Sequence, residues 1–349
     1  MKKFIPVNRP YIDKSDEQYI INNSIKKNNV TNSPLISLFE EKISNLCDRK
    51  YAVSVTSGTT ALEIAVKSLN LPSKSKILLP SFTIVSVLNA VLKNNLIPVF
   101  IDVKRNDYNI SINELLKFKP LKHISAAIIV STYNSASEID KVINCLKKNN
   151  IKIIEDAAES FGGSYKNKPF GSFGDISILS FYSNKLITTG EGGMILTNNK
   201  KIFNYCNKSK NLFFDEKNRN FSHKEIGSNY RFPSILAALG ISQLKKIKYF
   251  INHRQKLYNY YFFNLNSELL EFQNIKKDIK SSYWVFPVIL KLKNLKFDSK
   301  FFINELNKEN IQARHFFYPL PDQPFFKKKI SKKFKINARY IYKYGLYLP

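Results

Sequence analysis

Short apolar runs alternate with amphipathic stretches through the first two thirds of the chain. The apolar runs predict strands at residues 51–55, 76–80, 98–103, 126–131, 151–155, 175–181 and 193–197. Apolar residues at helical spacing between several of these runs predict helices at residues 59–69, 84–93 and 139–149. Strands that alternate with helices of this length indicate parallel pairing and a three-layer α/β domain. The run at 126–130 is apolar at every position, which is typical of a strand covered on both faces.

The pattern changes at about Pro233. A long helical stretch runs through Leu236 to about Leu270 and is followed by a strand-like segment at residues 284–292. A helix near residues 299–310 and an aromatic segment at residues 316–319 come next. We therefore expect a large α/β domain with an N-terminal arm at residues 1–245, then a smaller α+β domain at residues 246–349.

Composition sets limits without assigning a function. The chain has 349 residues, 44% of them hydrophobic, so it can bury a sizeable core. Its net charge of +28 is compatible with an anionic substrate or with nucleic acid, but the lysines are spread along the chain rather than clustered. The three cysteines and four histidines show no metal or disulfide spacing. With no membrane-length apolar run and no signal peptide, we expect a cytoplasmic protein that binds neither metal, membrane nor nucleic acid.

A predicted strand ends in carboxylates at residues 153–159. In open α/β sheets, ligands bind outside the carboxyl ends of the strands, so Asp156 is placed where an active-site acid would be. An aspartate at this point is equally suited to cap a following helix. The segment alone leaves both interpretations open.

Lys185 follows another predicted strand and precedes a glycine cluster at residues 190–193. A lysine in a partly desolvated pocket has a lowered pKa and becomes a nucleophile toward a carbonyl. Pyridoxal phosphate (PLP) chemistry needs such a lysine, together with an acid that faces the pyridine nitrogen of the cofactor. Taken alone, Lys185 would be a surface lysine. Its flanking residues instead favour the PLP hypothesis, with Asp156 as the acid.

A third segment, residues 56–62, follows a strand and opens a helix with the sequence Thr-Ser-Gly-Thr-Thr-Ala-Leu. Backbone N–H groups at the start of a helix attract anions, here the phosphate of the cofactor. Ser-Gly-Thr also caps ordinary helices, so this segment supports a cofactor site only in combination with the segments that contain Asp156 and Lys185.

Together these motifs resemble the DegT/DnrJ/EryC1/StrS sugar aminotransferases, which are PLP enzymes of the aspartate-aminotransferase fold, fold type I. The resemblance runs from about Ile5 to the last residue. It is carried by residues 56–62, 80–83, 155–159, 171–175, 180–193, 227–231 and 237–240. It implies a three-layer, mostly parallel sheet with a small α+β C-terminal domain.

The resemblance also implies roles for individual residues. Lys185 matches the lysine that holds the cofactor covalently, and Asp156 matches the partner of the pyridine nitrogen. Asn229 matches an asparagine that reaches the phosphate from the neighbouring subunit, which implies an obligate homodimer with shared active sites. The remaining matches are to cofactor contacts at Ser57, Gly58, Thr59, Glu159 and Ser180, and to substrate contacts at Arg231 and Tyr318.

Within the family, Asn184-Lys185, residues 187–193 and Glu159 look most like perosamine-synthase-type enzymes. These transfer an amino group from L-glutamate to a nucleotide-linked 4-keto-6-deoxy sugar for surface polysaccharide synthesis such as O-antigen. A 3-amino sugar aminotransferase and a non-catalytic regulatory or nucleic-acid-binding protein on the same scaffold are the alternatives. A dehydratase of this family would need a histidine at the position of Lys185.

At four places the chain departs from the family pattern, and these departures limit which residue roles the resemblance implies for this chain. Ile84 stands where an aromatic ring usually covers the cofactor, and residues 131–134 differ from the usual segment after that strand. Pro321-Asp322 replaces a common histidine. The chain ends at Pro349, where the family continues into a further helix, so we expect either a trimmed small domain or an incomplete sequence.

Overall fold

A computed structural model of the chain describes residues 3–133, 135–136, 138–214, 221–223, 225–291, 297–326 and 336–349. Asn134, within the departure at residues 131–134, and residue 292, at the end of the strand expected at 284–292, lie outside the described residues. Within the described part, no helix combines the length and the apolar character that crossing a membrane would require.

A seven-stranded sheet forms the centre of the large domain, in the order β1-β9-β8-β5-β4-β2-β3. All seven strands predicted from the sequence are present, with small differences at their ends. Five of them, β2, β3, β4, β5 and β8, are paired in parallel with at least one neighbour, and all of these except β3 are buried over most of their length. The strands are β1 Tyr51–Val55, β2 Lys76–Pro80, β3 Ile97–Ile101, β4 Ala126–Val130, β5 Lys152–Asp156, β8 Ile176–Ser180 and β9 Gly193–Thr197.

The sheet is mostly parallel, as expected, and the exceptions are the pairings of β9, which runs antiparallel to both β1 and β8. A parallel crossover needs room for a helix or a similarly long connection. The connection of residues 181–192 contains no helix, so the chain turns back directly into β9. This short return places Lys185 in a loop at the carboxyl end of β8.

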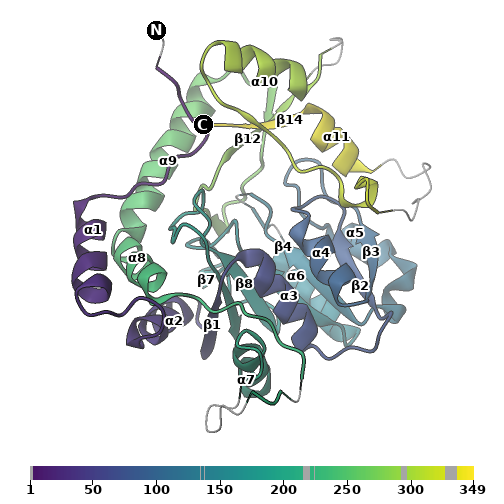
Figure 1. The fold of residues 1–349 in the computed structure, drawn as a ribbon. Coiled ribbons are helices and arrows are strands. Elements are labelled where there is room, and N and C mark those ends of the chain that lie inside the picture. Colours follow the sequence, from purple (N-terminus) through teal and green to yellow (C-terminus); the bar gives the residue numbers. More distant parts are fainter. Residues whose placement is uncertain are drawn as a thin grey trace.

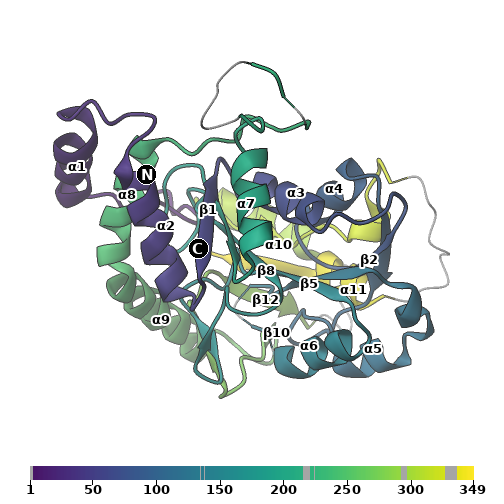
Figure 2. The ribbon, with the colours of Figure 1, turned by 90° about the horizontal axis from the view of Figure 1, so that it is seen from below.

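Helices cover both faces of the sheet, which confirms the three-layer prediction (Figure 2). On one face, apolar residues of α2, α5, α6 and α8 pack against the sheet, among them Phe39, Leu115 and Leu146. On the other face, residues of α3, α4 and α7 do so, among them Leu62 and Leu88. The bounds are α2 Pro34–Leu46, α3 Gly58–Ser68, α4 Ser86–Lys93, α5 Ile112–Lys117, α6 Ile139–Lys148, α7 Lys200–Ser209 and α8 Ser234–Lys245.

The helical stretch expected from residue 236 to about 270 is two helices, α8 and α9 (Ile247–Asn264), which meet at Lys246. The Lys246 ammonium forms ion pairs with two carboxylates of the N-terminal arm, Asp13 at 3.0 Å and Asp16 at 2.5 Å. The arm contains α1 (Lys14–Ile20) and a π-helical turn (Ile21–Ile25), and it lies along α8 and α9 (Figure 1). The helix is therefore interrupted at the position where the domain division was expected, and that division stays a prediction.

The proposed small domain, residues 246–349, contains a four-stranded sheet in the order β10-β12-β14-β13, which lies at the top of Figure 1. Its core includes Tyr258, Phe286 and Ile303. Leu346 of the last strand belongs to the same core, because β14 pairs with both β12 and β13. The elements are β10 Leu270–Phe272, β12 Phe286–Leu290, α10 Ser299–Lys308, β13 Arg314–His315, α11 Asn337–Tyr344 and β14 Gly345–Leu348.

Short elements complete the described chain. A three-stranded sheet pairs β6 (Ser164–Tyr165) with β7 (Lys168–Pro169) and with β11 (Ile279–Lys280). Single 3₁₀ turns lie at Lys119–His123 and Leu320–Asp322. In the second of these, Asp322, one of the family departures, forms an ion pair with Arg339 at 2.6 Å.

An aromatic cluster joins the two domains. Phe82 and Tyr133 of the large domain pack against Trp284, Phe316 and Tyr347 of the small domain. The rings of Tyr133 and Phe316 have their centroids 5.0 Å apart, and those of Phe82 and Phe316 are 5.9 Å apart. Because the cluster is buried, it fixes the small domain over the carboxyl ends of the sheet strands.

Candidate active site

A cavity of about 390 Å³ lies where the aromatic cluster meets the carboxyl ends of β5 and β8. Its wall is drawn from both domains, with α3 and α4 contributing their first turns. Seven residues that the sequence singled out line it, namely Ser57, Gly58, Thr59, Asp156, Glu159, Ser180 and Lys185. The position agrees with the general place of ligand sites in open α/β sheets.

The turn before α3 presents free backbone donors to this cavity. Ser57 is the N-cap, and its hydroxyl accepts the N–H of Thr60 at 3.1 Å. The Thr60 hydroxyl accepts the N–H of Ser57 in return at 3.0 Å. The N–H groups of Gly58 and Thr59 belong to the first helical turn, where no preceding carbonyl is available to them. They form an anion site together with the positive end of the helix.

Two glycines allow this turn to lie close to the sheet. A Cβ added to Gly58 would lie 2.9 Å from the Cβ of Ser180. A Cβ added to Gly193 would lie 2.3 Å from the carbonyl oxygen of Ser57. Any larger residue would therefore push the helix start away from β8 and β9. Ser180 lines the same cavity.

Asp156 is the last residue of β5 and is almost fully buried. Its Oδ1 accepts the N–H of Ala158 at 3.1 Å. It therefore closes a turn and does not cap an α-helix, which was the structural alternative for this residue. Burial raises the pKa of Asp156 to about 6, against the opposing effects of the Ala158 N–H and the charge of Lys185.

Glu159 lies on the turn after Asp156 and is also buried. Its Oε2 accepts the backbone N–H of Tyr133 at 2.8 Å. Burial raises the pKa of Glu159 to about 7, while the charge of Lys185 and the Tyr133 N–H act in the other direction. The site therefore contains two acids whose protonation changes close to neutral pH.

Lys185 lies in the 181–192 connection, with its backbone N–H bonded to the Tyr182 carbonyl at 2.9 Å. Burial lowers the pKa of its amine, and the carboxylates of Glu159 and Asp156 raise it in part. An amine with a lowered pKa has an unprotonated fraction near neutral pH that can attack a carbonyl. Nearby glycines with positive φ, Gly190 at 82° and Gly192 at 157°, permit the tight return into β9.

A buried network supports the strand that carries Asp156. Glu155 accepts the N–H groups of Gly171 and Phe173 at 2.8 and 2.7 Å. Arg49 donates to the Gly171 carbonyl at 2.8 Å and to the Ser177 hydroxyl at 2.7 Å. The turn at residues 171–175, which the sequence identified as a motif, is thus held from both sides and has a structural role.

These residues fit PLP. The α3 start provides donors for a phosphate, Asp156 provides a carboxylate for a ring nitrogen, and Lys185 provides an amine for an aldehyde. Ile84 lines the cavity beside them and is 37% exposed, so an aliphatic side chain occupies the position where the family has an aromatic ring. In the described part of the chain, no three His, Cys, Asp or Glu residues gather in a way that could hold a metal ion.

Three predicted site residues do not line this cavity. Asn229 and Arg231 are exposed on the segment before α8, and Arg231 donates to Asn211 Oδ1 at 2.9 Å. Tyr318 is 41% exposed and packs against Tyr342, with ring centroids 4.9 Å apart. The roles of all three stay predictions.

Four lining residues from the small domain were not identified from the sequence, namely Trp284, Arg314, Phe317 and Tyr347. The aromatic run at residues 316–319 is visible in the sequence, but the sequence contains no signal that brings it to Lys185. Arg314 is the strand residue of β13 that adds a cation to the cavity wall.

A sequence model of the DegT/DnrJ/EryC1/StrS aminotransferase family matches residues 11–349 of this chain. The chain belongs to this family. It is a family of PLP-dependent sugar aminotransferases, so the enzyme class and the cofactor expected from the sequence are both confirmed. The non-catalytic alternative is accordingly set aside.

Relatives of this aminotransferase extend over nearly its full length. GDP-perosamine synthase of Escherichia coli is 30% identical, with 95% of this chain and 89% of the relative covered. A UDP-4-amino-4,6-dideoxy-N-acetyl-beta-L-altrosamine transaminase of Campylobacter jejuni is 31% identical, with 97% and 90% covered. Helicobacter pylori PseC, an aminotransferase of pseudoaminic acid biosynthesis, has a similar structure, with a TM-score of 0.91, 25% identity, and 99% and 94% covered. The predicted fold type is thereby confirmed.

Proposed function

We propose that this aminotransferase moves the amino group of L-glutamate to a nucleotide-linked 4-keto-6-deoxy sugar, and that the nucleotide is GDP. The observation that carries the proposal is the single cavity in which Lys185, Asp156 and the start of α3 meet. The product would be a 4-amino-4,6-dideoxy sugar, a building block for a surface polysaccharide.

The proposed roles follow from the position of each group. Bound PLP supplies an aldehyde that takes up the amino group and a ring that withdraws electrons. Asp156 holds a negative charge against the ring nitrogen, and the α3 start holds the phosphate. Lys185 binds the cofactor and, once displaced by substrate, moves a proton at Nζ. The lowered pKa of Lys185 suits this base, because part of the amine is unprotonated near neutral pH.

Relatives and sequence motifs support the choice of substrate. Proteins named GDP-perosamine synthase in Escherichia coli and Vibrio cholerae share 30% and 28% identity with this chain. Both substrates of the proposed reaction carry anionic groups, and Arg314 places a guanidinium on the cavity wall. The earlier candidates Arg231 and Tyr318 remain proposed substrate contacts.

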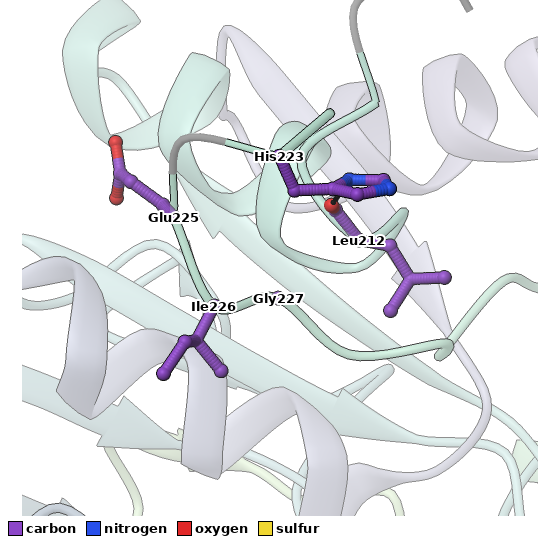
Figure 3. A pocket seen from close by; sticks show the side chains of 5 residues that line it. All are labelled: Leu212, His223, Glu225, Ile226 and Gly227. Carbon is purple, nitrogen blue, oxygen red and sulfur yellow. Dashed lines mark hydrogen bonds between the residues drawn. The ribbon is translucent and has the colours of Figure 1, made fainter. Parts of the chain in front are cut away.

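We further propose a homodimer in which Asn229 of one subunit reaches the phosphate site of the other. Asn229 is exposed and does not line the cavity of its own chain. Large apolar side chains nearby are also exposed, Ile226 by 87% and Phe221 by 77%. In Figure 3, the side chains of Glu225 and Ile226 point away from His223, beside a separate hollow lined also by Leu212 and Gly227. Burial of this surface by a second subunit would remove the exposed apolar groups from water.

The test is a panel of GDP-, UDP- and dTDP-linked 4-keto-6-deoxy sugars and their 3-keto isomers, each incubated with L-glutamate and the PLP-loaded enzyme. The product mass identifies amination, NMR locates the new amine, and 2-oxoglutarate is measured as the coproduct. Lys185→Ala, loaded in the same way, is the control. We expect turnover with the GDP-linked 4-keto sugar. Preferential amination of a UDP- or dTDP-linked sugar, or of C3, would overturn the proposed substrate and leave the family assignment intact.

A further inference from the structure

Trp284 contacts Lys185 in two ways. It is the only tryptophan of the chain, lies just before β12, and is buried. Its indole Nε1 donates a hydrogen bond to the carbonyl oxygen of Asn184 at 2.8 Å. The face of the same indole lies below the Lys185 amine, with Nζ 3.9 Å from the ring centroid. One side chain thus contacts both the backbone next to Lys185 and its reactive nitrogen.

We propose that Trp284 is a positioning residue for Lys185, fixing the peptide that carries this lysine through its N–H and holding the amine over the cavity through its ring. The inference rests on the proposed cofactor role of Lys185 and adds to that role a small-domain residue that sets where the amine lies. The inference also gives the aromatic cluster that joins the two domains a role in the active site.

The backbone around Lys185 depends on contacts from outside its own loop. The Asn184 carbonyl accepts a second bond, from Asn8 Nδ2 of the N-terminal arm at 3.2 Å. The Lys185 carbonyl accepts Arg254 Nη2 of α9 at 2.9 Å. The 181–192 connection has no helix, and donors from three distant segments bind its backbone at Asn184 and Lys185. Trp284 is the one of these three donors whose side chain also contacts the amine.

The indole itself is held in place by neighbouring rings. Its centroid lies 5.9 Å from that of Tyr133 and 6.3 Å from that of Tyr347. Both neighbours are buried, and tilted aromatic pairs at such distances are favourable. A ring packed in this way offers a fixed surface to the amine, whereas a flexible side chain would follow its movements.

The ring also affects the protonation of Lys185. An aromatic face attracts an ammonium group and so favours the charged amine over the neutral one. This attraction acts in the same direction as the carboxylates of Asp156 and Glu159, and against burial and the charge of Arg254. Glu191 and Arg314 line the same cavity and complete the charged surroundings. Loss of the ring should therefore lower the pKa of Lys185 further.

The experiment compares Trp284→Leu, which removes both contacts, with Trp284→Phe, which keeps a ring and loses the N–H donor. Phe286→Leu is the matched control, because Phe286 belongs to the small-domain core and not to the cavity wall. Cofactor-free protein is reductively methylated across a pH series, and peptide mass spectrometry follows the modification of Lys185. Far-ultraviolet circular dichroism and thermal melting establish that each variant is folded.

We expect the pH midpoint of Lys185 modification to fall by about one pH unit in Trp284→Leu and to shift less in Trp284→Phe. In the loaded enzyme, Trp284→Phe should lower kcat about five- to tenfold with little change in KM, because one positioning hydrogen bond is lost. Phe286→Leu should leave both quantities near wild type. An unchanged or raised midpoint in folded Trp284→Leu would overturn the inference. The methylation result does not require cofactor, so it stands or falls separately from the proposed function.

Discussion

Asp156→Asn should change activity and stability in opposite directions. The substitution keeps the shape of the side chain, and an amide oxygen can still accept the Ala158 N–H that Oδ1 accepts at 3.1 Å. It removes the negative charge that we place against the cofactor ring nitrogen. Losing one charge-stabilising contact in an active site costs about 3 kcal/mol or more, so turnover should fall at least a hundredfold.

The effect on stability follows from the pKa. Burial raises the pKa of Asp156 from 3.8 to about 6 in the folded protein. A raised pKa means that this group stabilises the fold below pH 3.8, and that the contribution is lost as the pH rises through 6. Two pKa units correspond to about 3 kcal/mol. At pH 8 the charged aspartate therefore lowers the free energy of unfolding of the cofactor-free protein by about this amount. Asn carries no charge, so the variant should be more stable there, by about 1 to 3 kcal/mol.

The assay is urea unfolding of cofactor-free protein at pH 5 and at pH 8, with single-turnover rates measured on loaded protein. Asp140→Asn is the control, because partial burial raises the pKa of Asp140 but hydrogen bonds from Lys166 and Tyr165 lower it more. That variant should lose stability at pH 8 and keep its turnover. Near-normal turnover in Asp156→Asn would show that the charge against the ring lies elsewhere. We compare the free energy of unfolding of Asp156→Asn with that of wild type at each pH. If the gain in stability over wild type is smaller at pH 8 than at pH 5, the electrostatic argument is refuted.

Three further outcomes are expected. Co-expressed Lys185→Ala and Asn229→Ala chains should regain activity as purified heterodimers, about half of wild type, because one of the two shared sites is then intact; heterodimers no more active than the parents would disprove shared sites. Arg49→Met should lower the free energy of unfolding by about 3 to 5 kcal/mol, since it removes both the positive charge that acts on the buried Glu155 and the hydrogen bonds to the Gly171 carbonyl and the Ser177 hydroxyl, and a loss below about 1 kcal/mol in urea titration would contradict this. Gly193→Ala should weaken PLP binding in equilibrium dialysis, because its Cβ would meet the Ser57 carbonyl oxygen in the phosphate turn; wild-type affinity would show that the turn can move aside.

The strands could be predicted because each is a short apolar run, and such runs are recognisable when a strand is buried on both faces. Their direction was harder. Alternation with helices indicated parallel strands, but apolar patterning contains no information on direction, and β9 returns antiparallel after a connection without a helix. The single helix expected beyond residue 236 is interrupted at Lys246, whose side chain forms ion pairs with the N-terminal arm.

The candidate site was predictable where its residues lie next to strand ends. Asp156 and Lys185 each follow an apolar run directly, and Ser57–Thr59 opens a helix, so local sequence contained their signal. Trp284 and Arg254 were missed because their bonds to the lysine segment span 100 and 69 residues. Contacts over such separations arise only when the two domains pack together, and a single sequence without this packing does not show them.

The central claim is that the cofactor is attached to Lys185 in the cavity formed by β5, β8 and the start of α3. Borohydride reduction of the PLP-loaded enzyme, followed by proteolysis and mass spectrometry, tests it most directly. The account predicts a pyridoxyl group on the peptide that contains Lys185, and no such label in Lys185→Ala treated identically. A label on a different lysine, or an equal label in Lys185→Ala, would contradict it.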